Sequence, residues 1–156
     1  MMHKGHATVT DWTTAPATGL CVLDLWHGAA HVAGGIDLPA PGRALAHGEG
    51  HVLRVGPRRW WLDGADLGAL DPAHGALTAI GGGWTRVRVT GPDWRAMLME
   101  GALFDAEDPT FVPGSVATGL FAHAHVVVHV RDAAVIDLFV PATLADHVLG
   151  LWRAHP

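Results

Sequence analysis

Glycine and proline recur so often along this chain that long regular elements cannot form. Twenty glycines and ten prolines are spread through 156 residues, and both residue types interrupt helices and strands. The chain must therefore fold from short elements joined by many turns. Because 49% of the residues are hydrophobic and only 16% are charged, we expect a folded domain with a substantial core, not a disordered chain.

Alternating apolar and polar residues indicate strands in the second half of the chain. Residues 85–90 (TRVRVT) place Val87 and Val89 on one face and Arg86 and Arg88 on the other. This alternation predicts a half-buried strand whose arginines point outward. Further strands are expected at 115–122, 125–131 and 135–140.

Two short helices are predicted to pack against these strands. The first follows Pro92, a favoured first helical residue, and ends before Gly101. We expect Thr143 to cap the second helix, with Asp146 three residues later as its capping-box partner. Apolar stripes at helical spacing contain Trp94, Met97 and Leu98 in the first helix, and Leu144, Val148, Leu149 and Trp152 in the second.

The first half of the chain carries weaker signals. Residues 1–18 predict a flexible leader, and residues 19–156 a single domain of two pseudo-repeat halves, about 19–78 and 79–156. A turn with Gly-Pro should fold residues 60–62 back as a hairpin. The other expected elements are strands at 19–27 and 51–55, a loop at 34–50 and a short helix at 65–70.

Charge and cysteine content narrow the class of protein. The formal net charge is −5, with Lys4 as the sole lysine, and no basic cluster of the kind that binds nucleic acid is present. Cys21 is the single cysteine, which favours a reducing compartment. The N-terminus lacks the apolar segment of a signal peptide, and no apolar run is long enough to span a bilayer. We therefore expect a soluble, cytoplasmic protein.

Twelve histidines raise the hypothesis of a metal site. His27 and His31 would share one face of a helix, but no Glu completes a zinc motif. His123, His125 and His129 would share one face of a strand, although residues 122–124 predict a turn that breaks the alignment. A metal site needs three or four ligands at fixed geometry, so ordinary surface or core histidines are the default interpretation.

Other candidate motifs lack their supporting context. Cys21 could be a nucleophile, but its position in a strand favours a small buried hydrophobe. The glycines at 34–35 and 81–83 carry no phosphate-loop pattern and predict flexible turns. Catalytic residues, cofactor-binding residues and metal ligands are therefore predicted to be none.

A pair of tryptophans beside two arginines is the best candidate for an interface. In a strand Trp60 and Trp61 point to opposite faces, so at most one should belong to the core. Trp and Arg are enriched at binding hot spots. We therefore predict Arg58, with Trp60 or Trp61, at a contact with a partner.

In residues 88–98 (RVTGPDWRAML), 111–114 (FVPG) and 137–141 (DLFVP), the chain resembles the gamma subunit family of heterotetrameric sarcosine oxidase. Residues 88–98 (RVTGPDWRAML) are similar to that family's strand, Gly-Pro and helix. The resemblance covers roughly residues 20–154 and rests on the order and spacing of its segments. The other matching segments are 38–39 (LP), 53–62 (LRVGPRRWWL), 100–105 (EGALFD), 111–114 (FVPG) with 117–118, 126–129 (VVVH), 137–141 (DLFVP) and Leu149 with Trp152.

This resemblance implies a fold and a role. The fold would be α+β, with antiparallel sheets and packed short helices, in two ferredoxin-like halves resembling the folate-binding domain of the glycine-cleavage T-protein. The role would be that of a non-catalytic structural or assembly subunit, partnered by alpha, beta and delta subunits. The partners would carry FAD, FMN, NAD and tetrahydrofolate, and this chain no cofactor. The complex would oxidatively demethylate sarcosine or a related N-methyl amine.

Two other functions stay open on the sequence alone. The chain could be a stand-alone binder of folate or another small molecule, of the aminomethyltransferase type, with Asp105 or Asp137 as the acid in its pocket. It could also be a histidine-based metal-binding protein.

Overall fold

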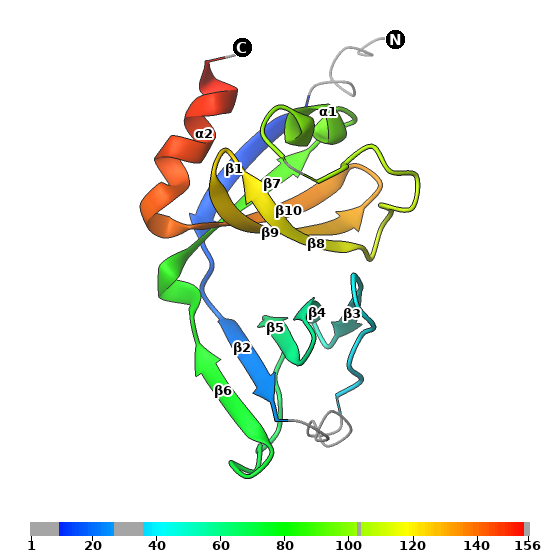
Figure 1. Ribbon diagram of the computed structural model, residues 1–156, viewed down its shortest axis with the longest axis vertical. Helices are drawn as coiled ribbons and strands as arrows, with labels where there is room; N and C mark the ends of the chain where they lie inside the picture. Colours follow the sequence, from blue (N-terminus) through cyan, green and yellow to red (C-terminus); the bar gives the residue numbers. More distant parts are fainter. Residues whose placement is uncertain (1–9, 27–35, 103, 155–156) are drawn as a thin grey trace.

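The fold consists of two five-stranded antiparallel sheets stacked face to face (Figure 1). The computed structural model describes residues 10–26, 36–102 and 104–154. Sheet A has the order β1-β7-β10-β9-β8 and sheet B the order β3-β4-β5-β2-β6. Sheet A consists of β1 (Asp11–Pro16), β7 (Trp84–Thr90), β10 (Val135–Pro141), β9 (Ala124–Asp132) and β8 (Val116–Phe121). Sheet B consists of β3 (Ala44–His47), β4 (Gly50–Gly56), β5 (Arg59–Asp63), β2 (Leu20–Leu25) and β6 (Gly75–Ala79).

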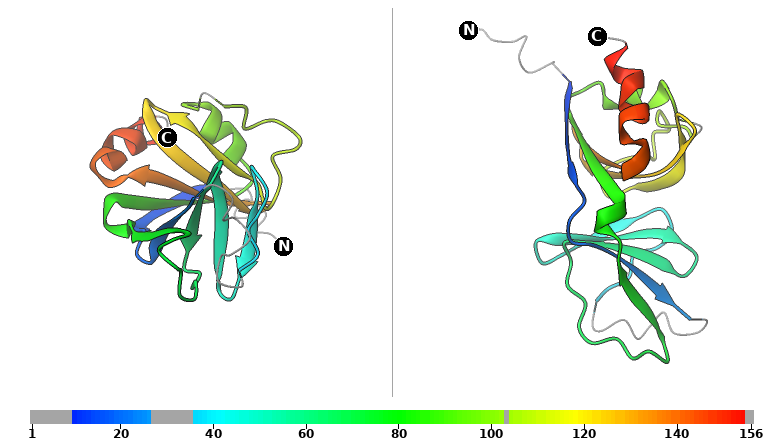
Figure 2. Two further views of the ribbon diagram at one scale, coloured as in Figure 1. Left: turned by 60° about the horizontal axis from the view of Figure 1, so that its bottom comes forward. Right: turned by 90° about the vertical axis from the view of Figure 1, so that its left-hand side faces the viewer.

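Two short helices cover the outer face of sheet A. Helix α1 (Trp94–Met99) and helix α2 (Ala145–Arg153) lie on the side away from sheet B, as the views in Figure 2 show. They bury Trp94, Leu98 and Trp152 against the apolar residues of β7, β9 and β10. The predicted α+β class, with antiparallel sheets and packed short helices, is confirmed. None of the described helices is both long and apolar enough to cross a membrane.

The space between the two sheets holds a second apolar cluster. Trp61 from β5 packs edge-on against Trp84 and Phe139, with ring centroids 4.7 and 5.6 Å away. Leu53 and Val127 belong to the same cluster. The central strands β5, β9 and β10 are buried on both faces, because successive residues of a strand point to opposite sides.

Loops cover the outer face of sheet B. Residues 65–70 cross this face without forming a helix, so the helix predicted there is wrong. A helix of six residues interrupted by Gly68 is too short to be stable alone. Leu67 and Leu70 instead pack against a third apolar cluster, which contains Trp60 and Leu62.

The predicted leader is wrong for its last part. Residues 11–16 form β1, which pairs along its whole length with β7 from Asp11↔Thr90 to Pro16↔Thr85. The Thr-rich sequence suits an edge strand, and Trp12 packs on Trp152 with ring centroids 6.2 Å apart. Strand β1 therefore belongs to the sheet built by the second half of the chain.

Most other predicted strands are confirmed, and the remaining differences concern β3, β6 and the start of α2. The predicted loop at 34–50 contains β3, and β6 was not foreseen. Thr143 does not cap α2, because a 3-10 turn over Ala142–Leu144 precedes the helix and its N-cap residue is Leu144. Leu144 is 38% exposed, whereas Val148, Leu149 and Trp152 form the buried stripe as predicted.

Candidate functional site

A buried cluster of charged residues lies on the face of sheet A that meets sheet B. At its centre Asp137 of β10 is fully buried and lies opposite Arg88 of β7 in the strand register. Arg88 donates two hydrogen bonds to the Asp137 carboxylate, of 2.7 and 2.9 Å. Arg131 of β9 donates a third, of 3.2 Å. The hydrogen bond to Asp137 raises the pKa of Arg88, so these groups form a charge-assisted network.

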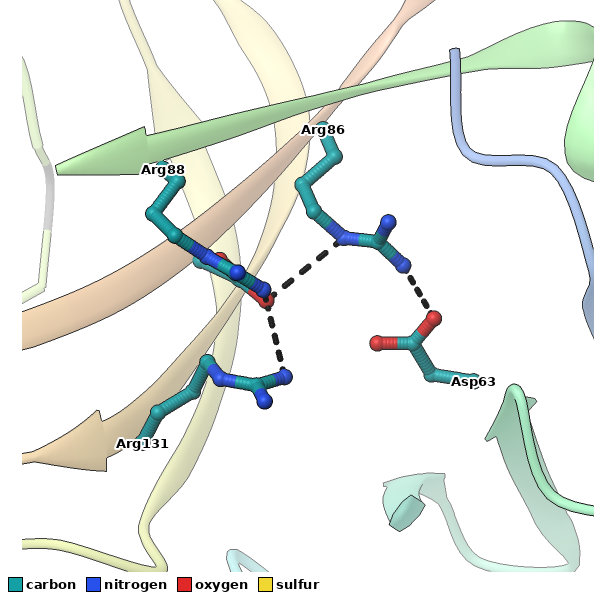
Figure 3. Close-up of polar contacts among 5 residues, drawn as sticks. Asp63, Arg86, Arg88 and Arg131 are labelled. Carbon is teal, nitrogen blue, oxygen red and sulfur yellow. Dashed lines mark hydrogen bonds and ion pairs between the residues drawn. The ribbon is translucent and has the colours of Figure 1, made fainter. Parts of the chain in front are cut away.

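Arg86 extends this network across to sheet B. Figure 3 shows its guanidinium directed toward Asp63 of β5, with which it forms a close ion pair. Its Nε atom lies 3.5 Å from Asp137, an ion-pair contact whose geometry does not make a hydrogen bond. Asp63 is only 5% exposed, and burial is the main cause that raises the pKa of its carboxyl. We call Arg86, Arg88, Arg131, Asp63 and Asp137 the Arg–Asp cluster.

Two histidines join the sheets beside this cluster. His129 lies opposite Asp137 in the register of β9 and β10, and its ring meets the edge of His51 from β4 at a centroid distance of 4.8 Å. Burial, then the neighbouring His51, lowers the pKa of His129 to about 4. Burial, then Arg131, also lowers the pKa of His51. Both rings are therefore neutral near pH 7.

The Arg–Asp cluster is suited to holding the sheets together. Both of its carboxylates are already engaged by guanidinium groups. Charged groups in such a network can be tolerated away from water because each one is paired with an opposite charge. The prediction that Arg86 and Arg88 point outward is corrected for Arg86, which reaches across to Asp63 of sheet B. Arg88 pairs with Asp137 within sheet A and keeps 41% of its side chain exposed.

The same geometry bears on the acids proposed for a small-molecule pocket. Asp137 is fully buried and contacted by three arginines, so its carboxylate is not accessible to a ligand. Asp105 lies in an exposed turn, where it accepts a 2.9 Å hydrogen bond from the backbone N–H of Glu107. These two candidate acids are therefore not brought together in one pocket.

The predicted interface residues lie in three different environments. Trp60 is 1% exposed and Trp61 5% exposed, so the prediction that one of them points outward is wrong. Alternation does send them to opposite faces, but the loops cover one face and sheet A the other. Arg58 is exposed in the turn between β4 and β5.

Arg58 lines a cleft on sheet B that sequence reasoning had not identified. This cleft of about 610 Å³ is formed by residues 24–26 and 55–59, and we call it the turn groove. Trp26 on its wall is 48% exposed. Arg54 holds the turn in place, since its Nε donates a 2.8 Å hydrogen bond to the Gly56 carbonyl and its guanidinium stacks 4.7 Å from the Trp60 ring. The groove is thus a preformed surface with an exposed tryptophan.

The remaining candidates do not converge on a site. His123 lies in the turn after β8, with a φ of 68°, and is separated from the buried His129. Among the described residues no three His, Cys, Asp or Glu side chains are grouped as metal ligands. Cys21 is half-buried in β2, and residues 81–83 form a 3-10 turn. His27, His31 and residues 34–35 lie outside the described residues.

Comparison with known proteins yields a match of structure. No family model matches the sequence, and no curated protein matches it either. A chain of the heterotetrameric sarcosine oxidase from Corynebacterium sp. U-96, solved in complex with pyrrole 2-carboxylate, is similar in structure with a TM-score of 0.76. The match covers 93% of this chain and 82% of that chain, at 17% sequence identity. The two-sheet fold described above is therefore the fold of a heterotetrameric sarcosine oxidase chain.

Proposed function

We propose that this chain is a gamma-type, non-catalytic assembly subunit of a cytoplasmic flavoenzyme complex resembling heterotetrameric sarcosine oxidase. The observation that carries the proposal is the structural match over 93% of the chain, which agrees with the order of segments from residue 20 to residue 154. Alpha, beta and delta partners would hold FAD, FMN, NAD and tetrahydrofolate. The complex would oxidatively demethylate sarcosine or a related N-methyl amine.

The accessible chemistry of the described residues supports a docking role. The charged residues of the Arg–Asp cluster bind one another inside the fold. Two exposed side chains of the turn groove, Trp26 and Arg58, are of types that are enriched at interface hot spots. A preformed turn lowers the entropy lost on binding. The turn groove is therefore the first surface that we assign to partner contact.

The test is co-purification of the tagged chain from its native host at native expression level. We expect flavin-containing partners in constant ratio to the tagged chain, and amine-dependent hydrogen peroxide production by the purified complex. The double variant Trp26→Ala, Arg58→Glu should retain less of the partners, because it removes an exposed indole and reverses an exposed charge on the groove. Leu144→Ala, at an exposed site on the other sheet's side, is the matched control.

Two results would contradict the proposal. A stable, partner-free monomer from native expression would remove the assembly role. Heat released on calorimetric titration of that monomer with tetrahydrofolate would instead support the stand-alone binder, whereas zinc, nickel or copper found by elemental analysis of untagged protein would support the metal-binding alternative.

A further inference from the structure

Within the described part of the chain, strand β6 forms an open edge of sheet B. It pairs with β2 on one side only, from Cys21↔Ala79 to Leu25↔Gly75, and ends the strand order of that sheet. Thr78 and Ala79 are exposed, and Leu77 is 43% exposed. A row of unpaired backbone groups on such an edge is a template for another strand.

The hydrogen-bond register shows which backbone groups face outward. Ile80 donates a 2.9 Å hydrogen bond to Leu20, and Trp26 donates one of 2.8 Å to His74. In an antiparallel ladder hydrogen-bonded pairs alternate along the strand. Residues 76 and 78 therefore bond to β2, whereas the N–H and C=O groups of residues 75, 77 and 79 point away from the sheet. No described residue outside the sheet forms a backbone hydrogen bond with these outward-facing groups.

The other three sheet edges carry protection that β6 lacks. Strand β1 begins with Asp11 and ends with Pro16. Strand β8 is bridged at its two ends, by Ser115 to Arg43 and by Phe121 to Ala102. Strand β3 ends in His47 after four residues. The sequence of β6, GALTA, contains neither a charged residue nor a proline, although natural edges are usually blocked by such residues.

A shallow apolar groove lies beside the open edge. It has a volume of about 470 Å³ and is lined by residues 67–70, Pro72 and residues 75–77, and we call it the edge groove. Leu77 lies opposite Leu23 in the register, on the outer face of sheet B, so a residue paired with Leu77 on an added strand would project toward this groove. The indole of Trp26 in the turn groove donates a 3.4 Å hydrogen bond to the carbonyl of Pro72, which lines the edge groove.

We propose that an extended segment of a partner subunit adds to sheet B along β6 and places an apolar side chain in the edge groove. Main-chain hydrogen bonds to residues 75, 77 and 79 would give affinity, and the groove would select the side chain. This inference rests on the proposed function, because it specifies how the subunit docks.

A partner segment fits this surface better than a second copy of the chain. Two five-residue strands paired with each other would bury far less than the roughly 1,000 Å² expected of a stable interface. A partner segment can continue past Gly75 along the groove to the exposed Trp26. Each residue of a strand spans about 3.3 Å. A short segment is therefore long enough to run along β6 and reach Trp26.

The first test measures amide hydrogen exchange in the isolated chain and in the complex co-purified from the native host. We expect the amides of Leu77 and Ala79 to exchange quickly in the isolated chain and to become protected in the complex. The amides of Ala76 and Thr78 are protected in both states. Fast exchange at Leu77 and Ala79 in the complex would overturn the inference and leave the proposed function standing.

The second test uses variants of the edge. Leu77→Lys places a charge on the added strand's path, and Ala79→Pro removes an outward N–H without touching the ladder to β2. Each should lower partner recovery by roughly tenfold, whereas Thr14→Lys on the exposed strand β1 should not. Unchanged recovery with both variants would overturn the inference, as would light scattering that shows a β6-dependent homodimer. If the wild-type chain co-purifies with no partner, the proposed function is contradicted, and this inference is contradicted with it.

Discussion

Sheet A carries two helices on its outer face, whereas the described residues that cover the outer face of sheet B form loops (Figure 2). The helices bury two tryptophans and complete a core around the valines of β7 and β9. The loops leave Trp26 and Leu77 exposed beside two grooves. We therefore expect the covered core of sheet A to contribute more to stability, and we propose the exposed part of sheet B as the surface for a partner.

The largest effect is expected from emptying the helix-covered core. Trp94 is 2% exposed and donates a 2.9 Å hydrogen bond to the Ala133 carbonyl, so Trp94→Ala should cost about 3–5 kcal/mol of unfolding free energy. Leu70→Ala, in the loop cover of sheet B, should cost about 1 kcal/mol because Leu70 is only half-buried. Urea denaturation measures both free energies of unfolding. Equal losses would show that the helices on sheet A do not contribute more stability than the loops on sheet B.

Acid should weaken the contact between the inner faces of the sheets. Because the pKa of His129 is lowered from its ordinary 6.5 to about 4, the unfolded chain takes up a proton more readily than the folded one. The contribution of His129 to the free energy of unfolding is therefore fully present above pH 6.5. It decreases by about 3 kcal/mol as the pH drops toward 4. Denaturation at pH 7 and pH 4.5 tests this. If the His129→Phe variant loses as much free energy of unfolding between pH 7 and pH 4.5 as the wild type, another group is responsible.

The ion pair between the sheets should contribute less. Asp63→Asn leaves Arg86 with its contact to Asp137, so we expect a loss of about 1–3 kcal/mol. Asp24→Asn is the matched control, because Asp24 pairs with the exposed Arg59 within sheet B at 2.6 Å and such a surface pair contributes less than about 1 kcal/mol. A smaller loss at Asp63 than at Asp24 would show that the Arg–Asp cluster does not join the sheets.

The smallest effect on stability should come from the exposed residues of sheet B. Trp26→Ala and Leu77→Lys remove side chains that are nearly half exposed, so the unfolding free energy should change by less than about 1 kcal/mol. The same variants are expected to lose partner contact. Thermal unfolding of the isolated variants measures the first effect, and a loss as large as that of Trp94→Ala would mean that the grooves belong to the core.

Periodicity predicted the elements whose burial is simple. The strands around β8, β9 and β10 and the stripe of α2 were found because apolar residues recur at strand or helix spacing. Trp60 and Trp61 were misjudged because alternation shows that two residues face opposite ways, not that both faces are covered. Sheet B is buried on one side by loops, which carry no periodic signal.

The Arg–Asp cluster was only partly accessible to sequence reasoning. Arg86 and Arg88 were seen, but their partners come from strands distant in the chain, and nothing local indicates that β5 lies opposite β7. One signal was available: Asp137 stands within an apolar strand, IDLFV, and a carboxylate in such a setting requires a partner. The exposed edge of β6 could not be foreseen, since edges are defined by strand order.

The pairing of β1 has a consequence for the order in which the chain can fold during synthesis. Strand β1 leaves the ribosome before any of sheet B, yet its pairing partner is β7, which is made only after β2 to β6 are complete (Figure 1). Sheet B contains no strand later than β6, so it can assemble while sheet A still lacks four of its strands. We expect the nascent chain to hold β1 unpaired for that interval, and sheet A to assemble on the finished sheet B only once β7 has been made.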